Sequence, residues 1–147
     1  MGNIVEIIKN IPGCSAIEGC TKEQIQEAQD ALDILFPDEY IDYVKKFGCI
    51  DFGSTEWTGL NIKGRLNTVT ATKQEMDVNA FFPKGCFVLE NLGIDAKRVI
   101  VNEKGEVYIL QYDKKTYLCG SITEYLDMCI EKNTKSSFIL DMDIMFY

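Results

Sequence analysis

The sequence predicts an α+β protein in which the helices are segregated from an antiparallel sheet. Two observations support this class. Apolar residues follow a helical period over most of residues 1–47, whereas β-branched and aromatic residues gather in short runs over residues 86–119. We expect an antiparallel or mixed sheet of about five to six strands, with an N-terminal helix hairpin and a C-terminal helix packed on it.

Three helices are expected in the first third of the chain. The first covers residues 3–10, and the segment "GCSAIEGC" after it is expected to be a loop. Thr21 begins the second helix with the Thr-x-x-Gln spacing of a capping box. Pro37 opens the third helix, which we expect Gly48 to end. Because the connection between the second and third helices is short, we expect them to pack as an antiparallel hairpin.

The middle of the chain is expected to be mostly strand. The Gly-bounded segments "CIDFG" and "TGLNIKG" are strand-like, and a helix is expected near residues 72–78. Four runs rich in β-branched and aromatic residues follow: "CFVLENLG", "RVIVN", "EVYILQY" and "TYLCG". Polar turns at residues 103–105 and 113–115 join the last three of these runs. Consecutive strands with such short turns predict an antiparallel meander.

The C-terminal region is expected to begin with a helix. A capping box starting at Ser121 opens this helix, which we expect to end near Lys132. From Phe138 the sequence alternates between apolar and polar residues, which predicts a last strand or an extended arm. We interpret Asp141 and Asp143 as the polar face of this tail, in preference to a site for a divalent cation.

Composition argues against most enzyme classes. The chain has no histidine, which excludes Ser–His and Cys–His catalytic pairs. Its six cysteines contain no C-x-x-C pair, which leaves zinc binding unsupported and favours free thiols in a reducing cytosol. No apolar run reaches the roughly 18 residues of a membrane span. We expect a cytoplasmic, non-enzymatic protein with no cofactor or metal, folded as a single domain over residues 1–147.

The negative charge is concentrated in the N-terminal part of the chain. The net charge is -8, and residues 1–60 hold 11 acidic and 4 basic residues, whereas residues 61–147 hold 12 and 11. Such a chain is a poor ligand for nucleic acid, because phosphate is bound by Lys and Arg. An acidic face attracts a basic protein and accelerates its association. The alternative is that the charge serves solubility alone.

The order of the segments is more informative than any one of them. An acidic capped helix leads to "FPDEY", to a helix that ends "KKFG" and to "GSTEW", and the meander and a helix starting "SITEYLDMCI" follow. Over about residues 20–132 this order resembles the SUKH superfamily, named after the yeast cell-wall synthesis regulator Smi/Knr. The resemblance implies a SUKH-like fold.

The resemblance also implies a function by binding. Bacterial members of the superfamily act largely as immunity proteins that neutralise secreted polymorphic toxins in the producing cell, and one group protects against toxins of the LXG class. The implied partner is a cognate protein toxin with a basic nuclease domain, for which we favour an RNase over a DNase. Neither nucleic acid nor a membrane is an expected partner. The alternative is a non-enzymatic intracellular scaffold or regulatory module, as the eukaryotic members suggest, and a small enzyme with paired carboxylates is a more distant one.

Six residues on the predicted third helix and the loop after it are candidates for contact with the toxin. They are Asp38, Glu39, Asp42, Asp51, Glu56 and Trp57. The acids would complement a basic surface, and the tryptophan would supply an aromatic anchor of the kind that dominates interfaces. The alternative is that the acids are solvated surface groups and that the tryptophan pins the loop to the sheet.

Overall fold

The computed structural model describes the backbone of residues 3–146 and the side chains of residues 3–134. The helices are α1 (Ile4–Lys9), α2 (Lys22–Leu32), α3 (Asp38–Lys46), α4 (Thr68–Val78) and α5 (Ile122–Phe146). The strands are β1 (Ser15–Glu18), β2 (Phe47–Phe52), β3 (Thr55–Trp57), β4 (Cys86–Asn91), β5 (Lys97–Asn102), β6 (Val107–Gln111) and β7 (Lys114–Cys119).

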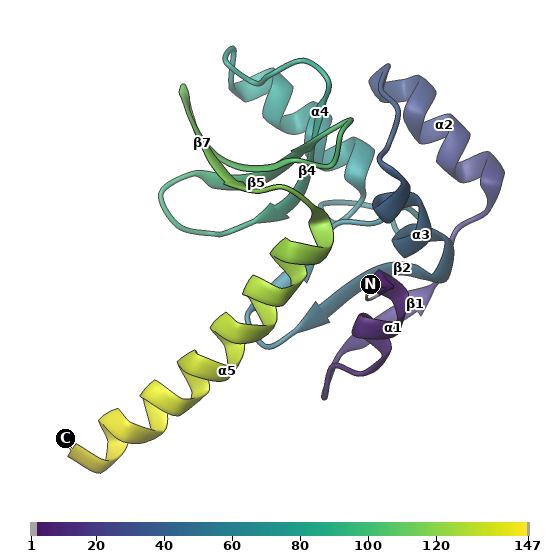
Figure 1. The fold of residues 1–147 in the computed structure, drawn as a ribbon. Helices are drawn as coiled ribbons and strands as arrows, with labels where there is room; N and C mark the ends of the chain where they lie inside the picture. The colour runs from purple at the N-terminus through teal and green to yellow at the C-terminus, as the bar shows by residue number, and fades with distance from the viewer. Residues whose placement is uncertain (1–2, 147) are drawn as a thin grey trace.

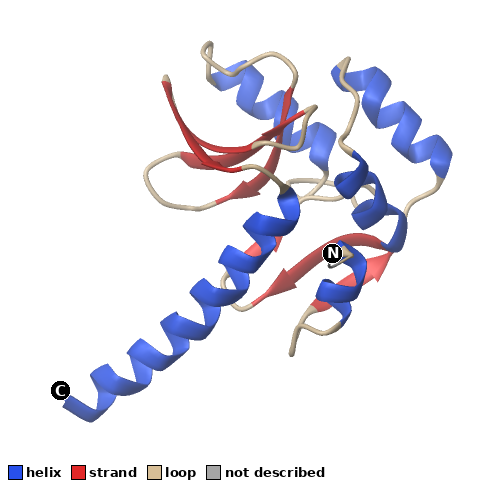
Figure 2. Cartoon of the chain, in the orientation of Figure 1, coloured by secondary structure: helices blue, strands red, loops and turns tan. Residues whose placement is uncertain are grey.

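The arrangement of these elements confirms the α+β class (Figures 1 and 2). The strands of the described chain form two antiparallel sheets, with the orders β1-β2-β3 and β4-β5-β6-β7. The second sheet is the predicted meander, because each of its strands pairs with the next one along the chain. The helix predicted near residues 72–78 is α4, which begins earlier because the Asn67 side chain caps its first turn.

The two sheets meet directly after β3. Thr58 donates its main-chain N–H to the carbonyl oxygen of Leu89 at 2.8 Å and its hydroxyl to the carbonyl oxygen of Val88 at 2.9 Å. The Tyr43 hydroxyl donates to the Thr58 carbonyl oxygen at 2.7 Å, which ties α3 to the same point. Backbone groups at the edges where the sheets meet therefore find partners inside the protein.

The helices enclose one large apolar core, but α2 and α3 do not form the predicted hairpin. The core contains side chains from α2, α3, α5 and both sheets. α2 packs against α4, whereas α3 packs against α1 and β2. The connection between α2 and α3 buries Ile34 and Phe36 in the core. These two side chains take part of the space that direct packing of the two helices would fill.

The first sheet departs from the sequence prediction in two places. The segment predicted to be a loop contains β1, whose four residues are all exposed and therefore show no apolar alternation. Gly48 does not end α3 but lies within β2, because α3 passes directly into the strand. A Cβ atom on Gly59 would lie 1.5 Å from the carbonyl oxygen of Gly48, so the loop after β3 approaches β2 this closely only through a glycine. Most of "TGLNIKG" belongs to this loop and is not a strand.

The prediction of a last strand or an extended arm is wrong. α5 continues as one helix to Phe146 and projects away from the rest of the protein (Figure 1). No glycine or proline follows Gly120, so the sequence contains no strong signal that ends the helix near Lys132. The side chains of Asp141 and Asp143 lie outside the described residues.

Candidate functional site

The predicted site residues lie on two separate pieces of structure. Asp38, Glu39 and Asp42 are on α3, where Asp38 and Asp42 are exposed and Glu39 is half-buried. Asp51 of β2 and Glu56 of β3 are cross-strand partners, so the first sheet brings these two acids side by side. The α3 acids are one helical turn apart, which places Asp38 and Asp42 on one face.

Glu39 is bound to another helix of the same chain. Its carboxylate accepts the main-chain N–H groups of Ile122 and Thr123, each at 3.1 Å, and also the Thr123 hydroxyl. These are free donors of the first turn of α5, which favours negative charge at that end. Ser121 adds the predicted cap, because its hydroxyl accepts the N–H of Glu124 at 3.1 Å. Glu39 therefore holds α3 and α5 together.

Replacement of Glu39 by alanine is expected to lower the free energy of unfolding by about 1–2 kcal/mol, because it removes a helix cap together with a helix-to-helix contact. Replacement of the exposed Asp42 by alanine is the matched control and should change stability by less than about 0.5 kcal/mol. Urea denaturation followed by circular dichroism measures both. Equal losses in the two variants would contradict the capping role.

Trp57 lies in the centre of the core. Its side chain is 0% exposed. Its ring packs edge-on against Tyr43, with centroids 5.5 Å apart, and stacks on Tyr125 of α5 at 6.0 Å. It therefore joins β3 to α3 and α5 and has no surface to offer a partner. This placement favours the core interpretation over the aromatic anchor.

A buried carboxyl group that the sequence did not single out lies beside Trp57. Glu90 of β4 is 2% exposed, and it accepts hydrogen bonds from the Tyr125 hydroxyl and, more weakly at 3.9 Å, from the Cys129 thiol. A β-bulge between Val88 and Glu90 interrupts the register of β4 with β5. Burial raises the pKa of Glu90 above its usual value of 4.5, and the donors together with the positive charge of Lys132 offset only part of this rise.

The raised pKa of Glu90 predicts a pH-dependent stability. The folded state binds this proton more tightly than the unfolded state, so the contribution is full below the unfolded pKa and is lost as the pH rises through the folded pKa. Replacement of Glu90 by glutamine keeps the shape and removes the titration. The stability of this variant relative to the native protein should grow as the pH rises above the usual carboxyl pKa of 4.5. If urea denaturation gives the same pH dependence of stability for the native protein and the variant, this would contradict the assignment of the titration to Glu90.

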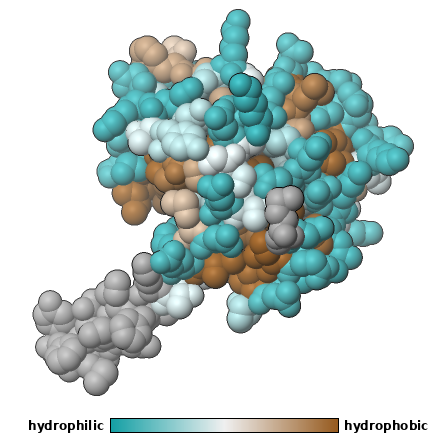
Figure 3. Space-filling model, in the orientation of Figure 1, coloured by the Kyte–Doolittle hydropathy of each residue, from teal (hydrophilic) through white to brown (hydrophobic). Residues whose placement is uncertain are grey.

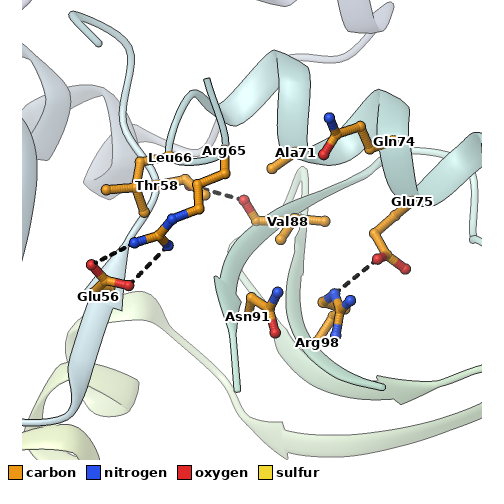
Figure 4. Close-up of a pocket in the computed structure, with 10 residues that line it drawn as sticks. All are labelled: Glu56, Thr58, Arg65, Leu66, Ala71, Gln74, Glu75, Val88, Asn91 and Arg98. Carbon is orange, nitrogen blue, oxygen red and sulfur yellow. Dashed lines mark hydrogen bonds and ion pairs between the residues drawn. The ribbon is translucent and has the colours of Figure 1, made fainter. Parts of the chain in front are cut away.

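A small pocket separates α4 from β3 and β4, and two Glu–Arg pairs face each other across it (Figure 4). Its volume is about 100 Å³. Arg65 binds Glu56 through two N–O contacts of 3.0 and 3.2 Å, and Arg98 binds Glu75 at 2.8 Å. These are the two arginines of the chain. Each of the two guanidinium groups at the pocket is therefore paired with its own carboxylate.

The cysteine thiols are no better suited to catalysis than these paired carboxylates. The six cysteines are free, and five of them are buried. Burial raises the pKa of these buried thiols and brings that of Cys129 to about 12, so little of the reactive thiolate forms at neutral pH. Among the described side chains, no group of three or more acids or cysteines could hold a metal ion. No helix in the described part of the chain is long and apolar enough to cross a bilayer.

The fold and these contacts define an α+β protein that presents acidic helices and has no assembled catalytic group among the described side chains. The SUKH_5 family model, described as SMI1-KNR4 cell-wall, matches residues 1–131. The chain belongs to this family. No curated protein matches it. The match includes residues 1–19, which the sequence resemblance had not covered, and these contribute α1 and β1 to the fold.

Proposed function

We propose that this chain is an immunity protein that binds and neutralises a cognate toxin by direct contact. Within the superfamily we place it nearest to the YobK-like bacterial members. The partner is then a toxin of the LXG class with a basic nuclease domain, for which an RNase is favoured. The protein acts in the cytoplasm of the producing cell, as one SUKH-like domain and without chemistry of its own.

Family membership is the observation that carries this proposal, and the charge distribution supports it. Immunity function is typical of bacterial SUKH proteins, and a nuclease must present Lys and Arg to phosphate. The exposed acids of α2 and α3 are complementary to such a surface. In this proposal Asp38, Asp42 and Asp51 contact the toxin. Glu39 adds negative charge from a position already bound within the chain, whereas the charge of Glu56 is offset by Arg65.

Co-expression tests the proposal. A toxin gene of the LXG type is sought beside the gene of this chain, and the toxin that it encodes is expressed in a bacterial host, alone and together with the chain. We expect lethality from the toxin alone and normal growth from the pair. Unchanged lethality with soluble chain present would refute the immunity function and favour the scaffold alternative. The Glu39→Ala variant, which is expected to remain folded, should still protect.

A further inference from the structure

The connection between α2 and α3, residues 33–37, presents one apolar side chain to solvent. Leu35 is 65% exposed, although its neighbours Ile34 and Phe36 are only 6% and 4% exposed. Gln29 of α2 holds both neighbours: its carbonyl oxygen accepts the N–H of Ile34 at 3.1 Å, and its side-chain oxygen accepts the N–H of Phe36 at 2.9 Å. Leu35 is therefore held outward by a fixed backbone.

Leu35 stands between two shallow hollows. Their volumes are about 410 and 480 Å³, and Leu35 and Glu103 line both of them. Glu103 comes from the turn between β5 and β6, which packs against the connection: a Cβ atom on Gly105 would lie 3.5 Å from Pro37. Asn102 fixes this turn by accepting the N–H groups of residues 104 and 106. Two segments that are distant in sequence thus form one preformed surface.

Carboxylates surround Leu35 on this surface. We call it the Leu35 surface and define it by Asp30, Asp33, Leu35, Asp38 and Glu103. All four acids are exposed, and none of them takes part in an ion pair among the described side chains. Lys104 is the basic residue among those that line the hollows. The like charges repel one another, and apart from the hydrogen bond that Asp30 accepts from the Gln26 side chain at 2.8 Å, no ion pair among the described side chains offsets them.

We propose that the Leu35 surface is the docking site for the toxin, and this inference rests on the proposed function. An apolar side chain of the toxin packs on Leu35, and its Lys and Arg side chains bind the surrounding carboxylates. An apolar centre with a polar rim is the usual anatomy of a protein interface. Because the surface is held by backbone hydrogen bonds, little ordering is needed on binding.

The negative charge of the Leu35 surface favours the toxin over two other partners, a second copy of the chain and nucleic acid. A second copy of the chain would bind through a two-fold axis, which would bring two identical sets of carboxylates face to face. Nucleic acid is repelled for the same reason. The face of the protein that Figure 3 shows carries several apolar patches among hydrophilic side chains, so the surrounding carboxylates, and not apolar exposure alone, distinguish the Leu35 surface.

A pair of matched variants tests the inference. Leu35→Asn is compared with Ile94→Asn, because Ile94 in the turn after β4 is also 65% exposed. Both substitutions are on the surface and should leave the circular dichroism spectrum unchanged. The probe is the purified, catalytically inactive nuclease domain of the toxin that the co-expression test identifies. We expect Leu35→Asn to weaken binding by about tenfold or more, mainly through faster dissociation, and Ile94→Asn to leave the affinity unchanged.

The possible outcomes separate this inference from the proposed function. If the Leu35→Asn variant binds the toxin with native affinity, the inference is wrong, but the immunity function still stands. The same conclusion follows if both variants lose affinity equally. A failure of the native chain to bind the toxin would overturn both. Sedimentation of the chain alone adds a further outcome: a dimer that Leu35→Asn dissociates would assign the surface to a second copy. A photo-crosslinking residue at position 35, but not at position 94, should attach to the toxin.

Discussion

Replacement of Trp57 by alanine will lower the free energy of unfolding by about 3–5 kcal/mol, the range for a buried aromatic side chain. The indole is completely buried and contacts the rings of Tyr43 and Tyr125, so its loss opens a cavity between β3, α3 and α5. A domain of this size has a total stability of about 5–15 kcal/mol, so the change removes a large share of it.

Urea denaturation followed by far-ultraviolet circular dichroism measures this loss, because the variant no longer contains a tryptophan to report by fluorescence. Trp57→Phe is the matched control and should lose much less, since a ring remains in the same place. If the Trp57→Ala variant is as stable as the native protein but no longer binds the toxin, this would contradict the core role. It would instead support Trp57 as an aromatic anchor in the interface with the toxin.

Neutralisation of Asp38 and Asp42 as Asn will slow association with the toxin by about three- to tenfold at low salt. Both side chains are exposed on one face of α3, so they contribute to the long-range field without holding the fold together. Glu39 is left intact because it caps α5. The dissociation rate should change less than the association rate, as is usual for charges at the rim of an interface.

Stopped-flow association at two salt concentrations checks this prediction. The difference between variant and native protein should disappear near about 1 M salt, where the Debye length is about 3 Å. The control removes the same charge elsewhere, through Asp77→Asn on α4 and Asp113→Asn in the turn after β6, and should have a smaller effect. If native and variant proteins associate with the toxin at the same rate at low salt, the α3 acids do not contribute to the electrostatic steering of association.

Local signals in the sequence were sufficient for much of the fold. The capping box of α2 is formed as predicted, with Thr21 and Gln24 each accepting the N–H of the other at 3.1 and 2.8 Å. The meander also forms, because short turns leave consecutive strands no other way to pair. Both features depend on residues that are close together in the chain.

Features that depend on distant residues could not be predicted in the same way. Glu39 looks like any exposed helix acid until α5 is placed above it, 83 residues further along the chain. Gly48 fits a helix end, but it lies in β2 against β1, where a Cβ atom would come within 2.6 Å of the Glu18 carbonyl oxygen. Leu35 lies in a connection whose burial pattern is decided by hydrogen bonds from Gln29. Of the residues that define the Leu35 surface, the sequence therefore predicts only Asp38 as a contact for the toxin.

The measurement that most directly tests neutralisation by contact is a titration of toxin activity. The purified chain is added in steps to the active nuclease domain of the toxin while RNA cleavage is recorded. We predict that cleavage falls in proportion to the chain added and ends at an equimolar ratio. Continued cleavage in excess chain, or complete inhibition by a small fraction of an equivalent, would contradict inhibition by a stoichiometric complex.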